Sequence, residues 1–349
     1  MLSFPGLLFA LATDFGTEDA RYMAYEKIYA GENLKNASES LSLPWWMRKL
    51  PPQAFETPLE GKLPDSEIFS KHIVNLIPEQ EYDLPVWLRK VIRSYQLCDE
   101  SFALWVAGIP LLYTRAHEVC ESDDTLELLA AWAWYSQNTD TDAHQLIQTL
   151  WHPNMGIHKA LDAAKTWYNR AKLVLFIGES GIQDCWLEGD RINGFDIVPL
   201  RTAQDFITES QLMNNCLDQY ADQIRFHRVR VFSVRREGTP IANIEIGPHE
   251  DDRTMPSIEQ VRGPKNRRVN PLIWQLAYNW MGKQNFSSRQ NGPNWPRITT
   301  PANAHPLWQP FQQALHNAGI YTQDLSIFNL DKTEKLLLQL EDLAQIGND

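Results

Sequence analysis

The stretch RVRVFSVRREGTPIANIEI, residues 228–246, decides the fold of the second half of the chain. Apolar and polar residues alternate over 228–235 and again over 241–246, which is typical of two half-buried strands. The four residues between them, EGTP, indicate a tight turn, so we predict an antiparallel hairpin. The loop has two or four residues, and either register places Arg230 and Glu245 on one face, opposite or diagonal to one another.

The segments on either side extend this unit. A third strand is predicted over 258–262, ending at Gly263 and Pro264, and a helix is predicted over 271–281. Before the hairpin, a helix over 208–224 is indicated by residues that share one face at helical spacing, namely Met213, Cys216, Leu217, Tyr220 and Ile224. The short runs 185–187 and 196–200 are bounded by glycines and are interpreted as strand or loop.

Helical patterns dominate the first half of the chain. The run 125–135 is apolar almost all round, which predicts a buried helix, and further helices are predicted near 142–150 and 157–176. A final helix is marked by Leu336, Leu337, Leu340 and Leu343. We therefore predict an α+β fold with a helix-rich N-terminal region, 1–170, a domain with a small antiparallel sheet packed with helices, 171–285, and a C-terminal loop with helices, 286–349.

The composition is that of a globular protein. The 349 residues are 43% hydrophobic and include 13 Trp, so a large core can form without disulfides. No apolar run is long enough to cross a bilayer, and we expect no membrane partner. The cysteines show neither metal-ligand spacing nor a C-x-x-C pair, and we expect reduced thiols in a cytoplasmic protein; they are Cys98, Cys120, Cys185 and Cys216.

The sequence offers no strong cofactor or metal motif, and we expect neither. The run His249 to Asp252 is acidic, but consecutive residues rarely converge on one ion, so a solvated loop is the better interpretation. The segment after 173–177, GESG, lacks the Gly-Lys-Ser/Thr ending of a phosphate-binding P-loop.

Positive charge is concentrated in the second half of the chain. The formal net charge is -12, yet residues 225–268 hold ten Lys or Arg against six Asp or Glu. Such a segment favours contacts to phosphates, with Phe226 and Phe232 as candidates for stacking on bases. The alternative is a solvated strand face balanced by the acidic helices. The candidate nucleic-acid-binding residues are Arg228, Arg230, Arg262, Lys265, Arg267 and Arg268.

An ordered set of residues stands out in this region, namely Cys216, Tyr220, Ser233, Arg235, Glu245, Gln260, Gly263 and Asn266. Their order resembles the PcfJ-like family, over roughly residues 186–281. In that family a His-Cys pair on a helix precedes a Tyr, a strand ending in Ser-x-Arg, a strand with Glu, and Gln-x-x-Gly-x-x-Asn. Asn215 stands where the family has His, which puts any activity that depends on that His in doubt. The family is named for a protein encoded with conjugative-plasmid transfer genes, so the resemblance implies mobile-element or DNA-processing contexts.

The same residues are the candidates for chemistry. Glu245, Arg235, Gln260 and Asn266 would form a polar site that binds a base, a sugar or a phosphate, with Glu245 as a general acid or base. The alternative is a structural network in which Glu245 pairs with Arg230. Cys216 lies on the apolar stripe of the predicted helix, so we expect a buried structural thiol in the core of the motif, together with Tyr220.

Three functions remain open at this point. The first is a nucleic-acid-associated accessory or effector protein of a mobile genetic element, as in conjugation, or of host defence against phage. Its PcfJ-like domain would contact nucleic acid or nucleotide, and its helical N-terminal region would recruit a protein partner. The second is an enzyme acting on nucleic acid or a nucleotide with Glu245 as acid or base. The third is a protein-binding adaptor without nucleic-acid contact.

Overall fold

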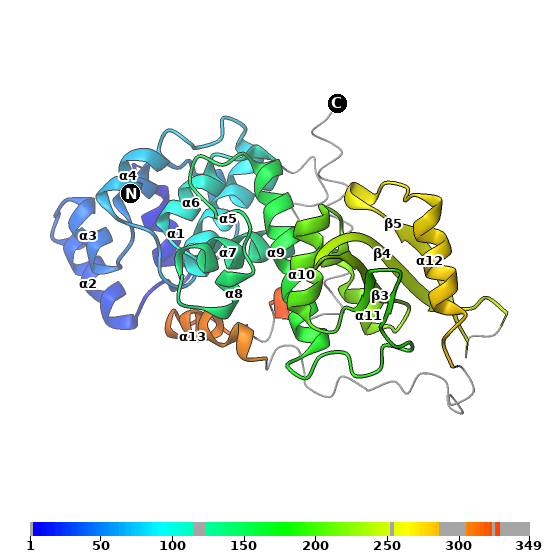
Figure 1. Ribbon diagram of the computed structural model, residues 1–349. Coiled ribbons are helices and arrows are strands. Elements are labelled where there is room, and N and C mark those ends of the chain that lie inside the picture. The colour runs from blue at the N-terminus through cyan, green and yellow to red at the C-terminus, as the bar shows by residue number, and fades with distance from the viewer. Residues whose placement is uncertain (1–2, 115–122, 252–254, 286–304, 323–324, 329–349) are drawn as a thin grey trace. The chain divides into compact units, whose positions relative to one another are not determined.

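The computed structural model describes residues 3–114, 123–251, 255–285, 305–322 and 325–328 (Figure 1). The chain divides into two compact units, Met1–Lys165 with Pro306–Asp349, and Thr166–His305, and each is described here by itself. The final helix predicted around Leu336 to Leu343 lies outside the described residues, as does Asp252.

The first unit is helical. Its elements in chain order are α1 (Pro5–Ala12), α2 (Glu18–Tyr29), α3 (Leu34–Ser40), α4 (Glu67–Ile73), α5 (Leu84–Leu97), α6 (Glu100–Ala107), α7 (Asp124–Gln137), α8 (Asp142–Gln145) and α13 (Gln309–Asn317). Helix α9 (Ile157–Ile177) begins in this unit and ends in the second. None of the helices in the described part of the chain is both long and apolar enough to span a membrane.

Helix α7 lies in the core of this unit, as its apolar sequence predicts. Trp132 is fully buried on it, and so is Trp87 on α5. Residues near the C-terminal end of the chain complete this core, because the Tyr135 hydroxyl donates to the carbonyl oxygen of Leu307 at 2.9 Å. The Glu127 carboxylate likewise accepts from the backbone N–H of Ser326 at 2.8 Å. The first unit is therefore made of two separate stretches of chain.

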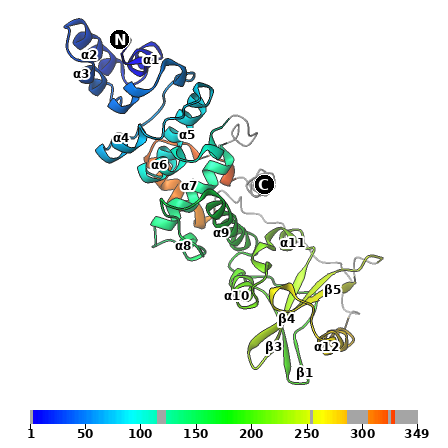
Figure 2. The ribbon, with the colours of Figure 1, turned by 90° about the horizontal axis from the view of Figure 1, so that it is seen from above.

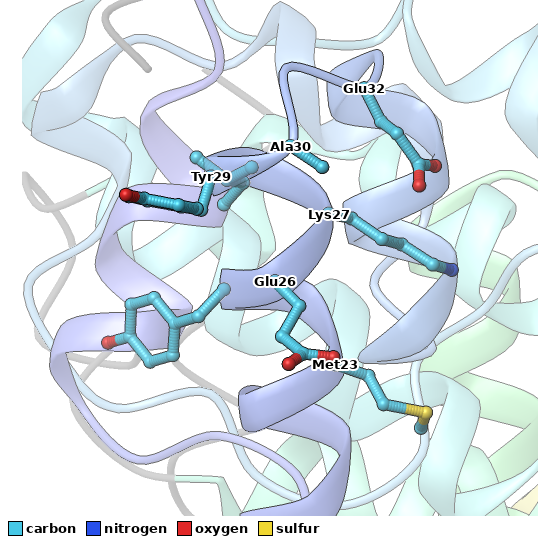
Figure 3. A pocket seen from close by; sticks show the side chains of 8 residues that line it. Met23, Glu26, Lys27, Tyr29, Ala30 and Glu32 are labelled. Atoms are coloured by element: carbon cyan, nitrogen blue, oxygen red, sulfur yellow. The ribbon is translucent and has the colours of Figure 1, made fainter.

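A hollow on α2 lies on the surface of the first unit (Figure 3). Its lining includes Met23, Tyr25 and Tyr29, and the Tyr29 side chain is almost wholly exposed. The Lys27 ammonium at its border donates to Ser40 Oγ at 2.8 Å. The hollow is thus bordered by exposed aromatic side chains.

The second unit contains a five-stranded antiparallel sheet in which every strand pairs with its neighbour in the sequence (Figure 2). The strands are β1 (Asp190–Ile192), β2 (Phe195–Pro199), β3 (Arg230–Arg236), β4 (Thr239–Pro248) and β5 (Pro256–Arg262). Helices α10 (Ala203–Met213) and α12 (Pro271–Met281) contact this sheet at β4 and β1, and α11 (Ala221–Arg225) belongs to the same unit. The predicted hairpin, the predicted third strand and the helix over 271–281 are confirmed, and with them the α+β fold.

The register of the hairpin differs from the predicted one. Glu237 and Gly238 form a two-residue turn with φ of 53° and 81°, the left-handed geometry that suits a twisted hairpin. Arg235 pairs with Pro240, but Val234 pairs with Ala242, so Ile241 is an extra residue on β4. One inserted residue moves every later side chain to the other face. The predicted pairing of Arg230 with Glu245 is therefore wrong.

The single helix predicted over 208–224 is also wrong. Helix α10 begins earlier, at a capping box formed by Thr202 and Asp205, and ends at Asn214, whose φ of 49° and ψ of 56° are left-handed. The Ser210 hydroxyl donates to the carbonyl oxygen of Asn215 at 2.6 Å, which holds the turn that follows. A short 3-10 turn, Leu217–Gln219, and α11 complete the segment.

Candidate functional site

The sheet of the second unit has one apolar face. Phe232, Ile244 and Val261 pair across β3, β4 and β5, so their side chains point to the same side. Trp280 of α12 packs against Phe232, with a ring-centroid distance of 4.7 Å. Phe232 is fully buried there, so the structure removes it from the residues that were predicted to stack on bases.

The opposite face of the same strands is polar. Ser233, Asn243 and Arg262 form one row of paired residues across β3, β4 and β5. Glu245 and Gln260 pair in the next row along the same face. The inserted Ile241 is what turns Glu245 and Asn243 toward this side. Glu209 of α10, and Asn215 and Tyr220 on either side of the 3-10 turn, bond to this face.

A buried carboxylate lies at the centre of the contact between α10 and the polar face. Glu209 is 1% exposed, and its Oε1 accepts from Asn243 Nδ2 at 2.6 Å. Its Oε2 accepts from Arg235 Nη2 at 3.3 Å, and Arg235 Nε donates to Ser233 Oγ at 3.1 Å. Asn215 Nδ2 donates to Asn243 Oδ1 at 2.8 Å. These bonds satisfy groups that would be costly to bury alone.

Arg235 is therefore engaged by Glu209. It was predicted to position a substrate, and the structure places it in the network that attaches α10 to the sheet. Asn215, which stands in the position of the family's His, belongs to the same network. Sequence reasoning missed Glu209 and Asn243, although both lie inside the segments that it assigned to a helix and a strand.

Glu245 is bonded to Tyr220. The Tyr220 hydroxyl donates to Glu245 Oε1 at 2.6 Å, and burial, the hydrogen bond to Glu245 and the charge of Glu245 together raise the pKa of Tyr220. The phenol therefore stays protonated and remains a donor at physiological pH. The nearby Arg262 guanidinium opposes this shift of the Tyr220 pKa. A carboxylate held by a phenol, beside an arginine, is an arrangement that can accept a proton or bind a polar ligand.

Other residues that match the PcfJ-like pattern lie around Tyr220 and Glu245. Gln260 is opposite Glu245, and its Oε1 accepts from Arg262 Nε at 3.0 Å. Asn266 Nδ2 donates to Cys216 Sγ at 3.7 Å. Cys216 is half-buried and precedes the 3-10 turn, so the prediction of a buried thiol within a continuous helix is corrected on both points. Glu245, Gln260 and Tyr220 are thus brought together, with Cys216 and Asn266 as a bonded pair.

Arg230 lies at the other end of the sheet and is buried, with 4% of its surface exposed. Its guanidinium lies 4.5 Å from the ring centroid of Trp186 and donates to the carbonyl oxygen of Asp184 at 2.9 Å. Its Nη2 lies 2.9 Å from His227 Nδ1. The structure therefore removes Arg230 from the predicted nucleic-acid surface, because its charged group is held inside the protein.

The remaining predicted cations are divided between two places. Strands β3 and β5 both run antiparallel to β4, so their carboxyl ends, Arg236 and Arg262, point toward the same end of the sheet. The basic loop, residues 263–270, follows β5 at this end. Arg228 precedes β3 and so belongs to the opposite end, where its guanidinium lies 5.2 Å from the ring centroid of Phe226.

Three cations of the basic loop are exposed, namely Lys265, Arg267 and Arg268. Within the described residues, none of the three side chains forms an ion pair or a side-chain hydrogen bond. The loop is held by its backbone, because the N–H of Gly263 donates to the carbonyl oxygen of Arg267 at 2.8 Å. The three cations line a hollow together with the apolar residues Ile241 and Ile273.

No curated protein and no solved structure matches the chain. A family model, described as PcfJ-like protein, matches residues 162–272, a range that holds α10, the whole sheet and the basic loop. The polar face and the basic loop thus lie within a PcfJ-like segment of the chain, as the ordered polar residues of the sequence indicate.

Proposed function

We propose that the PcfJ-like segment binds nucleic acid or a nucleotide through the basic loop, residues 263–270. The observation that carries this proposal is that Lys265, Arg267 and Arg268 are exposed and have no ion-pair partner in the described part of the chain. Cations that were neutralised by neighbouring carboxylates would leave little charge for a ligand. Arg236 and Arg262 add positive charge toward the same end of the sheet.

The charge distribution supports the same proposal. The whole chain carries a formal charge of -12, so a polyanion is repelled from most of its surface. A local group of unpaired cations gives such a ligand a favourable approach. Phosphates bound there release condensed counterions, which supplies affinity that depends little on base sequence. The setting we propose is an accessory or effector protein of a mobile genetic element or of host defence.

The test is a titration of labelled single- and double-stranded DNA and RNA at low salt. We expect binding to at least one of them. The triple variant Lys265→Glu, Arg267→Glu, Arg268→Glu should weaken it at least about tenfold, because it removes three phosphate contacts and adds repulsion.

The matched control is the triple variant Lys49→Glu, Lys71→Glu, Arg89→Glu. It makes the same change of net charge at exposed positions of the helical unit and should bind nearly as the unaltered protein does. If no nucleic acid binds at low salt, or if the two triple variants lose affinity equally, the proposal is wrong. The adaptor function, in which the helical unit contacts a protein partner, then takes its place.

A second function is favoured by the bond between Tyr220 and Glu245. A carboxylate that accepts a short hydrogen bond of 2.6 Å and lies opposite Gln260 is positioned as an acid or base toward a nucleotide bound at the polar face. Glu245→Gln keeps the shape and removes the proton acceptor. For an enzyme, we expect turnover of labelled nucleic acid or nucleoside triphosphate to be lost while binding is retained. Equal turnover by both proteins would exclude this role.

A further inference from the structure

Helix α12 carries two aromatic side chains that stack on one another on its flank. The ring centroids of Trp274 and Tyr278 are 5.6 Å apart, with an angle of 28° between the ring planes. The residues of α12 that face the sheet are Leu276, Ala277 and Trp280, all of them buried. Tyr278, in contrast, is 62% exposed. One ring face of the pair is therefore open to solvent.

This aromatic pair begins next to the basic loop. The loop runs directly into α12, where the Asn270 side chain accepts from the N–H of Leu272 at 2.9 Å and caps the helix. Ile273 of the first helical turn lines the same hollow as Arg267 and Arg268. Trp274 is the next residue, four positions after Asn270, or about 6 Å along the helix axis. Tyr278 follows one turn later.

We propose that this part of the molecule binds single-stranded nucleic acid, with a base stacked on the open face of Tyr278 and phosphates bound by the basic loop. The inference rests on the proposed function and names its substrate class. In a duplex each base is covered on both faces by its neighbours, so only an unpaired base can offer a face to an aromatic ring. Aromatic rings beside a basic groove are the usual means of holding such strands without a sequence preference.

The experiment compares two oligonucleotides of about 12 residues, one of thymidylates and one of abasic sites, which carry the same phosphates. Fluorescence anisotropy at low salt measures the affinity of each for the full chain. We expect the base-bearing strand to bind at least about fivefold more tightly. Tyr278→Leu should remove this difference and leave the affinity for the abasic strand unchanged, whereas Tyr278→Phe should keep it.

Two controls make the result specific. Tyr321→Leu removes another exposed tyrosine, 83% exposed and in the first unit, and should keep the preference for bases. The paired substitution Arg267→Ala, Arg268→Ala should weaken binding to both strands by the same factor. The thermal midpoint of Tyr278→Leu should match that of the unaltered protein, because the side chain is largely exposed.

The outcomes separate the two proposals. Equal affinity for base-bearing and abasic strands would overturn the stacking inference and leave phosphate binding in place. A preference that survives Tyr278→Leu would overturn it as well, since the base would then be held elsewhere. The absence of binding to either strand would overturn the proposed function and this inference together.

Discussion

Single residues of the second unit hold buried polar groups where α10 contacts the sheet. Glu209 is almost wholly buried and accepts hydrogen bonds from both Asn243 and Arg235. Water cannot replace these two donors, so Glu209 has fewer alternative partners than the other residues of the network. Arg235 can turn toward solvent when its partner is removed, since its side chain is 31% exposed. Asn243 is 3% exposed and would keep an unsatisfied amide.

We expect Glu209→Ala to lower the free energy of unfolding of the second unit by about 3 kcal/mol, the cost of leaving buried polar groups without a partner. Hydrogen exchange of the amides of β3 and β4 measures this loss locally. Glu250→Ala makes the same charge change at an exposed position and should alter exchange little. Unchanged protection in Glu209→Ala would show that the network contributes nothing to the stability of the sheet.

His227 gives the unit a dependence on pH. Burial, and then the positive charge of Arg230, lower the pKa of His227 to about 4 from its usual 6.5. Because the folded pKa is below the unfolded one, the stabilisation is present in full above about pH 6.5 and is lost as the pH falls toward 4. Asp184 opposes the shift of the His227 pKa but does not reverse it.

The substitution His227→Asn tests whether the titration of His227 makes the stability depend on pH. Asn tolerates the positive φ of 51° at this position, and its side-chain oxygen can accept the bond from Arg230. We expect the urea midpoint of the unaltered protein to fall more between pH 7.5 and pH 5 than that of the variant. If both proteins lose the same stability over this interval, the titration of His227 is not linked to folding.

At the scale of elements, the sequence predicted which segments are strands and which are helices better than it predicted how they pair. The alternation over 228–246 was sufficient for the hairpin, and the helix predicted to begin at Pro271 is α12. The alternation of apolar and polar residues does not reveal that Ile241 is an extra residue. Pro240 and Ile241 fit the pattern both with and without the insertion. The extra residue Ile241 sets the face to which Glu245 points, so the sequence analysis paired Glu245 with Arg230, which is wrong. The resemblance had already grouped Glu245 with Gln260, which lies opposite it in the sheet.

The end of α10 was missed for a different reason. Apolar residues continue at helical spacing through Ile224, so the apolar pattern gives no sign of the break that begins at Asn214. We expect Asn214→Ala to destabilise the unit by about 1 kcal/mol, because a side chain with a Cβ and no local hydrogen bond is strained in the left-handed region. Asn214→Gly should be close to neutral. Gln211→Ala, at an exposed helical position, serves as the control in urea unfolding.

For the whole molecule, charge is the property that the proposed function depends on. Ten of its 32 Lys and Arg residues lie within 225–268, and structure was needed to find which of them are free. Sequence could not show that Arg230 is buried against Trp186 or that Arg235 is bonded to Glu209, since both partners are distant in the chain.

If the proposed binding occurs, its salt dependence reports how many phosphates Lys265, Arg267 and Arg268 contact. We expect the slope of log affinity against log salt to become less steep by about 2 to 3 in the variant Lys265→Ala, Arg267→Ala, Arg268→Ala, because each phosphate contact contributes roughly 0.7 to 0.9. Measurements from 50 to 200 mM salt are sufficient. A slope that does not change would place the phosphate contacts on other residues.

The two separate stretches of the first unit have a consequence for how the chain is made. A ribosome releases the whole of Thr166–His305, whose strands pair only with their neighbours in sequence, before it reaches the residues that complete the helical unit. Local pairing of this kind forms quickly. Until residues 306–328 emerge, Tyr135 and Glu127 lack the partners that Leu307 and Ser326 provide. The order of synthesis therefore favours completion of the second unit before the helical unit has all of the residues that form its core.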